Sequence, residues 1–221
     1  MSLEKVVLMP HPPIALPEVA KERFEDVKTT AKAMQELSKD ILTLSPDLLI
    51  VITPHSGIHP EGFVTFTDSR LKGSFAKFGA PQVEMDIQND LEFIETLSEL
   101  NEQSLLQMKK ESPIDHGSAV PLYYILKEGY NGKVVIFNYS YGTQEKHKNF
   151  GKSLKKVADK LQKKTVLISS GDLSHRLKQG SPAGYNPKGK DFDQLIYDSI
   201  QSGDYSKIEN IDPLLRENAG E

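Results

Sequence analysis

Short runs of consecutive apolar residues alternate along this chain with longer stretches in which apolar residues recur every three or four positions. The short runs are residues 5–9, 48–53, 133–139 and 165–170. Runs of this kind are typical of strands buried on both faces. Helices are expected over residues 18–44, 89–100, 119–126, 143–161 and 190–202. The alternation predicts one α/β domain with a central, mostly parallel or mixed sheet and helices on both faces.

The remaining segments are less regular. Residues 63–67 and 82–87 are expected to form two further strands. Residues 68–81 include Gly73, Gly79 and Pro81 and are expected to form an irregular surface segment. Pro121 is placed in the first turn of the helix over residues 119–126, where a missing N–H is tolerated.

Three of the apolar runs are followed within a few residues by a histidine. His11 follows the first run, His55 the second, and His175 the run that ends at residue 170. Ligands of open α/β sheets bind at the carboxyl ends of strands, so these side chains are expected at one functional edge. His116 lies in a loop before a helix that can be brought to the same edge. Any one of them alone would more often be structural, but the shared context favours a site.

Imidazole is the commonest protein ligand of iron, zinc and related metals. Two imidazoles alone hold a metal weakly, so a carboxylate or a third imidazole is expected with them. The candidate carboxylates are Asp115, Asp172 and Glu221. The spacing is not that of a compact metal motif, so the residues by themselves leave a metal site and a structural role both open. His59 is interpreted as a loop residue and His147 as solvent-facing.

Composition narrows the class of protein. The 221 residues are 38% hydrophobic and 26% charged, as in a soluble globular domain. The net charge is −4 without a basic block, so a nucleic-acid partner is not expected. No apolar run approaches the roughly 20 residues of a membrane helix, and there is no secretory signal or cysteine, so a cytoplasmic location is expected. The pattern stops abruptly at Glu221, so residues 1–221 are interpreted as a fragment that lacks its C-terminal part.

Five short motifs are spread over nearly the whole chain. They are Pro10-His11-Pro12-Pro13-Ile14, Thr53-Pro54-His55, Asp115-His116-Gly117 with Val120-Pro121-Leu122, Ser170-Gly171-Asp172-Leu173-Ser174-His175, and Pro182-Ala183-Gly184-Tyr185-Asn186-Pro187. In this order they resemble the catalytic subunits of class III extradiol dioxygenases, the LigB-type family. More narrowly, they resemble the LigB-like domain of Memo-related proteins of the AmmeMemoRadiSam system.

The resemblance implies a non-haem Fe(II) site held by two histidines and one glutamate. His11 and His55 match the two ligand histidines. Glu221 ends a segment that resembles the one carrying the family's glutamate, and it is therefore the candidate third ligand. His175 matches the catalytic base, and His116 matches a histidine that lies beside the ligands or contacts the substrate.

The resemblance also suggests supporting residues. Asp172 and Ser174 are candidates to orient His175 by hydrogen bonds, with turn and helix capping as the alternative. Asp115 is placed beside the site. Aromatic walls for a substrate are expected from Tyr139, Tyr141 and Tyr185.

The favoured function is that of a non-haem Fe(II)-dependent, extradiol dioxygenase-like oxidoreductase acting on a catechol-type or related aromatic substrate. Two histidines and one carboxylate leave open positions on iron, and a histidine base can take a phenolic proton. One alternative is a Memo-like metal-binding protein without dioxygenase activity that works with protein partners. Another is a zinc-dependent hydrolase in which the same histidines activate water. A homo-oligomer is compatible with each, and no membrane partner is expected.

Overall fold

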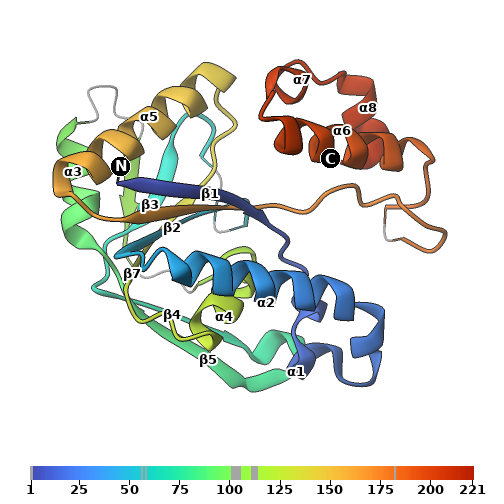
Figure 1. Ribbon diagram of the computed structural model, residues 1–221, viewed down its shortest axis with the longest axis horizontal. Coiled ribbons are helices and arrows are strands. Elements are labelled where there is room, and N and C mark those ends of the chain that lie inside the picture. Colours follow the sequence, from blue (N-terminus) through green and yellow to red (C-terminus); the bar gives the residue numbers. More distant parts are fainter. Residues whose placement is uncertain (1, 56, 58, 101–105, 111–113, 182) are drawn as a thin grey trace. The chain divides into compact units, whose positions relative to one another are not determined.

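The computed structural model describes residues 2–55, 57, 59–100, 106–110, 114–181 and 183–221. These form two compact units, Met1–Gly171 and Asp172–Glu221. The first unit contains the sheet, and the second is built from helices (Figure 1). Pro182, the first residue of the last motif, lies outside the described residues. That the two units form a single domain stays a prediction.

The sheet of the first unit has six strands in the order β1-β8-β2-β7-β3-β6. The first four of these run parallel to one another, β3 is antiparallel to β7, and β6 is parallel to β3. The sheet is therefore mixed, as predicted. Its strands are β1 (Leu3–Met9), β8 (Thr165–Ser170), β2 (Leu48–Thr53), β7 (Lys133–Asn138), β3 (Phe63–Phe66) and β6 (Leu106–Lys109).

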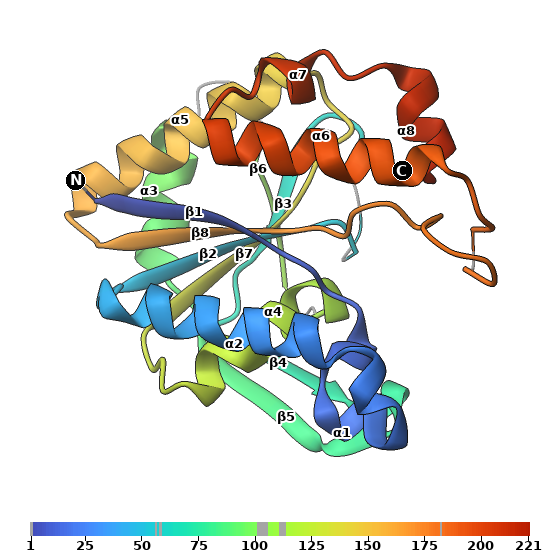
Figure 2. The same cartoon turned by 45° about the vertical axis from the view of Figure 1, so that its right-hand side comes forward.

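Helices lie on both faces of this sheet (Figure 2). On one face are α2 (Lys28–Thr43) and α4 (His116–Lys127), and on the other are α3 (Leu91–Leu100) and α5 (Gln144–Leu161). This arrangement confirms the predicted α/β class.

Strand β2 shows why its apolar run is continuous. Leu49 and Val51 point into the core that α2 and α4 cover, whereas Leu48 and Ile50 point into the core under α3 and α5. All four side chains are fully buried. Burial of each such side chain stabilises the fold by about 1.5–3 kcal/mol, so a polar residue at any of the four positions would be costly.

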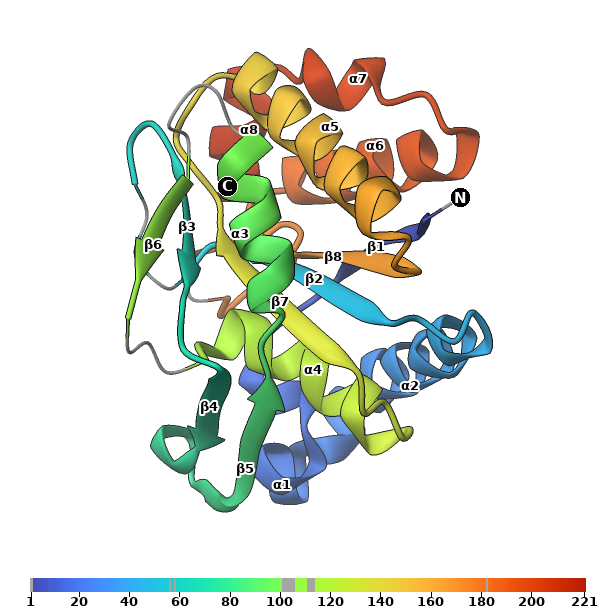
Figure 3. The same cartoon turned by 90° about the vertical axis from the view of Figure 1, so that its left-hand side faces the viewer.

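The expectation of an irregular segment over residues 68–81 was wrong. It contains β4 (Arg70–Phe75) and η3 (Ala76–Phe78), and β4 pairs antiparallel with β5 (Ala80–Gln88) (Figure 3). Leu71 and Phe75 are buried, but Gly73 between them hides the alternation in the sequence.

The single long helix expected over residues 18–44 was also wrong. The chain instead forms η1 (Pro13–Ala15), α1 (Pro17–Ala20) and η2 (Lys21–Asp26) before α2. Lys21 has a φ of 51°, which interrupts the helix. A 3₁₀ turn repeats every three residues, so it preserves nearly the same apolar spacing, and periodicity alone does not reveal the break.

The second unit contains α6 (Lys188–Ser202), α7 (Ser206–Glu209) and α8 (Pro213–Ala219). The first confirms the helix expected over residues 190–202. The last, α8, was not predicted from the sequence. At its start the Asp212 carboxylate caps the helix by accepting a hydrogen bond from the Leu214 N–H at 2.9 Å. None of the described helices is both long enough and apolar enough to pass through a membrane.

Candidate metal site

His11 and His55 are brought together by the order of the strands. Strands β1 and β2 both lie next to β8 and run parallel to it, so the turns that follow them meet at the same edge of the sheet. The Nε2 atoms of the two rings lie 2.9 Å apart. The rings are perpendicular, with centroids 4.8 Å apart. The edge predicted from the sequence therefore holds these two histidines in contact.

His116 is the third member of the group. It is the first residue of α4, and its ring centroid lies 4.1 Å from that of His55 and 5.7 Å from that of His11. One ring nitrogen from each histidine lies within 4.8 Å of the others, which marks these three, among the described residues, as a group that could hold a metal ion. His11 is buried, His116 is half-buried and His55 is exposed, so solvent reaches the group from the side of His55.

The separation of the nitrogens suits two ligands of one ion. Imidazole nitrogens bind a metal at about 2.1 Å, so two of them at a right angle lie about 3.0 Å apart. The Nε2 atoms of His11 and His55 are joined by a hydrogen bond of 2.9 Å, a separation close to that value. Three neutral imidazoles form a donor set for iron, zinc and related divalent metals, so the residues fit the metal that the sequence predicted.

The ring of His11 is fixed by Ser170, at the end of β8. The Ser170 hydroxyl donates its single proton to the carbonyl oxygen of Gly117. Ser170 Oγ therefore accepts the hydrogen bond that joins it to His11 Nδ1 at 2.9 Å. The proton of His11 lies on Nδ1, and the lone pair of Nε2 faces the other histidines, as a metal ligand requires.

Pro121 leaves the Gly117 carbonyl available for this contact. In a regular α-helix the N–H four residues further on would bond to that oxygen, and proline has no N–H. Because α4 begins at His116, Pro121 lies in the second turn and not in the first turn as predicted. A helix-interior proline thus indirectly sets which nitrogen of His11 carries the proton.

Asp115 links the segments that carry His55 and His116. It caps α4 by accepting hydrogen bonds from the Ser118 N–H at 3.2 Å and the Ser118 hydroxyl at 3.1 Å. It also accepts one from the Thr53 hydroxyl at 2.7 Å, and Thr53 Oγ1 accepts from the His55 N–H at 3.3 Å. The end of β2, which carries His55, is thereby joined to the start of α4, which carries His116.

Gly117 is required by close packing. A Cβ atom at this position would lie 2.5 Å from Thr53 Oγ1, 2.8 Å from Asp115 Oδ1 and 2.9 Å from His55 Cδ2. Real Cβ atoms do not approach other atoms that closely, so any side chain would displace the residues that orient the metal group.

Replacing Gly117 by alanine is expected to weaken metal binding by about 10–100-fold, the usual effect of disturbing residues that orient ligands. Titration of the metal-free protein with Zn(II) measures the effect. Gly151→Ala in α5 is the matched control, because a Cβ there has no neighbour within 4 Å. It should leave metal affinity unchanged and raise stability by about 1 kcal/mol. Equal metal affinity of the two variants would contradict this role of Gly117.

The remaining histidines of the first unit have structural contacts. His59 Nδ1 accepts a hydrogen bond from the Glu61 N–H at 3.2 Å, and its Nε2 lies 2.7 Å from the Gln107 amide. His147 is half-buried against Phe63, with ring centroids 5.2 Å apart, so it faces solvent only in part. Neither belongs to the metal group.

In the second unit, His175 is paired with Glu221. Its Nδ1 lies 2.7 Å from Glu221 Oε1, and its Nε2 lies 3.9 Å from Asp172 Oδ2. A carboxylate accepts hydrogen bonds, so the proton between His175 and Glu221 belongs to Nδ1. The His175 N–H also donates to the Ala219 carbonyl at 3.0 Å, which holds this loop against the end of α8.

Other polar groups surround this pair. Burial raises the pKa of the Glu221 carboxyl, and the hydrogen bond from His175 opposes that shift. The negative charges of Asp172 and Asp193 raise it further. Ser174 joins helices rather than contacting the imidazole: its N–H donates to Asp193 at 2.9 Å, and its hydroxyl donates to the Ala219 carbonyl at 2.9 Å.

One aromatic residue near the metal group was not predicted. Phe78, at the tip of the β4–β5 hairpin, lies edge-on to His116 with centroids 5.6 Å apart, and it is 37% exposed. The rings of the expected wall residues Tyr139 and Tyr141 pack against each other, with centroids 5.5 Å apart. Tyr185 is exposed in a loop of the second unit. Phe78 was missed because its segment showed no pattern, and only the pairing of β4 with β5 places it.

Residues 5–221 match the family described as "Catalytic LigB subunit of aromatic ring-opening dioxygenase". The chain belongs to the LigB family. It is 32% identical over 232 residues to Protein CA_C1420 of Clostridium acetobutylicum, covering 100% of this chain and 50% of that protein, so it spans about half the length of this curated relative. The LigB-family resemblance drawn from the motifs is therefore confirmed, and the narrower relation to Memo proteins stays a prediction.

A solved structure shares the fold of this LigB-family chain. The crystal structure of the uncharacterized protein JW3007 from Escherichia coli K12 superposes with a TM-score of 0.55 and 17% identity, over 85% of this chain and 80% of that one. Membership of the LigB family places the chain in the extradiol dioxygenase-like superfamily. The three histidines of this chain form a group that could hold a metal ion.

Proposed function

We propose that this LigB-family chain is a non-haem Fe(II)-dependent, extradiol dioxygenase-like oxidoreductase that opens the ring of a catechol-type or related aromatic substrate. The main support is the group of three imidazoles in a chain whose family is described as a ring-opening dioxygenase subunit. Fe(II) bound there would supply a Lewis acid and redox centre with open positions for substrate oxygens and dioxygen.

His11 and His55 are the proposed metal ligands, through Nε2. Ser170 and the Gly117 carbonyl keep the His11 proton on Nδ1, so the Nε2 lone pair remains available without a tautomer change. His116 is the third imidazole of the group. Glu221 as the third ligand remains a prediction of the family resemblance.

His175 is the proposed base. Because Glu221 accepts the Nδ1 proton, the lone pair of His175 is on Nε2, and that atom would take the phenolic proton of the substrate. The imidazolium that forms would be stabilised by the carboxylates of Glu221 and Asp172. Phe78 would offer an aromatic edge to a substrate ring beside His116.

The deciding experiment combines metal analysis with turnover. Protein purified without oxygen is analysed for metal, loaded with Fe(II), and mixed with a panel of catechols while dioxygen uptake is recorded. The proposal expects near-stoichiometric iron and uptake of dioxygen matched by loss of the aromatic ring. Bound iron without turnover of any catechol would contradict it and favour the Memo-like metal-binding protein without dioxygenase activity.

A zinc-dependent hydrolase is the second candidate, because three imidazoles are also a donor set of zinc enzymes that activate water. The two functions differ in their metal. If the Zn(II)-loaded protein hydrolyses an activated ester such as p-nitrophenyl acetate and the Fe(II)-loaded protein leaves catechols intact, the hydrolase replaces the dioxygenase.

A further inference from the structure

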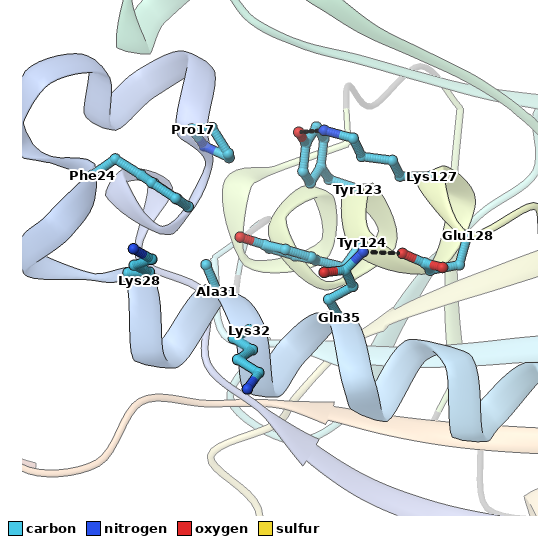
Figure 4. A pocket seen from close by; sticks show the side chains of 10 residues that line it. All are labelled: Pro17, Phe24, Lys28, Ala31, Lys32, Gln35, Tyr123, Tyr124, Lys127 and Glu128. Carbon is cyan, nitrogen blue, oxygen red and sulfur yellow. Dashed lines mark hydrogen bonds between the residues drawn. The ribbon is translucent and has the colours of Figure 1, made fainter.

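A pocket lies in the first unit, between the segment from Pro17 to Gln35 and the C-terminal half of α4 (Figure 4). Its volume is about 260 Å³. Tyr123, which lines it, follows His116 by seven residues, which is about 10 Å along a helix. The pocket is therefore separate from the metal group, although both are built on α4.

The walls of this pocket are largely apolar. They include Pro17, Phe24 and Ala31 together with the rings of Tyr123 and Tyr124. The two hydroxyls have other partners, since Tyr123 donates to Glu18 at 2.7 Å and Tyr124 to the Ala15 carbonyl. Both hydroxyls are therefore engaged within the protein, and both side chains are more than nine-tenths buried.

The polar groups of the pocket are mainly cationic. Lys28, Lys32 and Lys127 line it together with the carboxylate of Glu128, and Lys127 also pairs with Glu18 at 3.6 Å. The Glu128 carboxylate accepts a hydrogen bond from the Gln35 amide at 2.7 Å. Figure 4 shows Lys28 near Phe24 on one side and Lys127 at the Tyr123 hydroxyl on the other.

Within the part of the chain that the structure describes, two of these lysines form ion pairs with exposed glutamates. Lys28 pairs with Glu25 at 3.1 Å and Lys32 with Glu36 at 3.7 Å, and all four side chains are more than 60% exposed. Exposed pairs of this kind are worth about 0–1 kcal/mol, so an anion in the pocket can take over these lysines at little cost.

We propose that this pocket binds a small aromatic carboxylate with a single ring. Pockets for drug-sized molecules measure about 300–1,000 Å³, and a volume just below that range suits one ring with a short charged group. The ring would pack among Phe24, Tyr123 and Tyr124, and the carboxylate would pair with Lys28 and Lys32. This inference does not depend on the proposed function, because none of these residues belongs to the metal group.

Calorimetric titration of the full chain with benzoate tests the proposal, with benzamide as its uncharged counterpart. Benzoate is expected to bind about fivefold more tightly than benzamide, which corresponds to about 1 kcal/mol for one exposed charge contact. Absence of benzoate binding, or equal affinity for the two compounds, would overturn the proposal.

Variants locate the binding. Ala31→Met fills the pocket and is expected to abolish benzoate binding, whereas Ala33→Met, at an exposed position of the same helix, should not. The double change Lys28→Gln and Lys32→Gln should weaken binding by about fivefold. The matched control is the pair Lys156→Gln and Lys160→Gln in α5, which removes the same charge elsewhere.

The outcomes separate this site from the metal site. All four variants should bind metal like the unaltered protein, so a failure here leaves the proposed function untouched. If Ala31→Met does not fold, as judged by circular dichroism, the comparison of benzoate affinity between the two double lysine variants tests the proposal. Equal benzoate affinity of Ala31→Met and Ala33→Met, or of the two lysine pairs, would place the ligand outside this pocket.

Discussion

Replacing either His11 or His55 by alanine is expected to reduce bound metal to background. Their Nε2 atoms face each other at 2.9 Å, and loss of one leaves a set of imidazoles that holds an ion weakly. Disturbing a residue that merely orients a ligand costs about 10–100-fold in affinity, so removal of a ligand should cost at least about a hundredfold. Elemental analysis after anaerobic purification, followed by titration with Fe(II) and Zn(II), measures the change.

His59→Ala is the control for these variants, because His59 bonds to the Glu61 N–H and lies outside the metal group. It should bind metal normally. His116→Ala tests the third imidazole in the same assay, and a clear loss of affinity would support its role as a ligand. Normal metal occupancy in both His11→Ala and His55→Ala would remove the proposed site.

His175→Ala is expected to keep its metal and lose turnover by about 10²–10⁴-fold, the usual contribution of a general base. The reason is that His175 would act on the substrate proton through Nε2, with Nδ1 held by Glu221 at 2.7 Å. The measurement is kcat with a catechol on Fe(II)-loaded protein, together with metal content. Loss of metal on this change would contradict the assignment as base.

Glu221→Gln separates two roles of the partner carboxylate. Glutamine can still accept the His175 Nδ1 proton but lacks the negative charge that stabilises the imidazolium. If Glu221 is a metal ligand, metal affinity falls together with turnover. If it only positions His175, metal affinity is kept and turnover alone falls. His147→Ala, a histidine outside both groups, should change neither quantity.

Local sequence determined the α/β class and the strand-end positions of the histidines. Successive side chains of β2 face two different cores, so consecutive residues of this strand must be apolar. This applies to Leu48, Leu49, Ile50 and Val51. The motifs around His11, His55 and His116 are each short, but together and in this order they indicated the LigB family. That His11 and His55 lie at one edge of the sheet followed from the general rule that the ends of parallel strands share an edge, whereas their contact depends on the order of the strands.

Only the tertiary structure decided how those histidines are oriented. Ser170 reaches His11 because β8 lies beside β1, and the partner of Ser170 is the Gly117 carbonyl that Pro121 leaves free. Periodicity contains no information on which strands become neighbours, so this relay was not predictable from the sequence.

The same limit explains the other differences. Phe78 approaches His116 only because β4 pairs with β5, and the pocket lined by Phe24 and Tyr123 forms only where separate helices meet. Apolar spacing reports which side of an element is buried. The neighbour that covers that side is selected by packing between segments far apart in the chain, and so it is settled only when the chain folds.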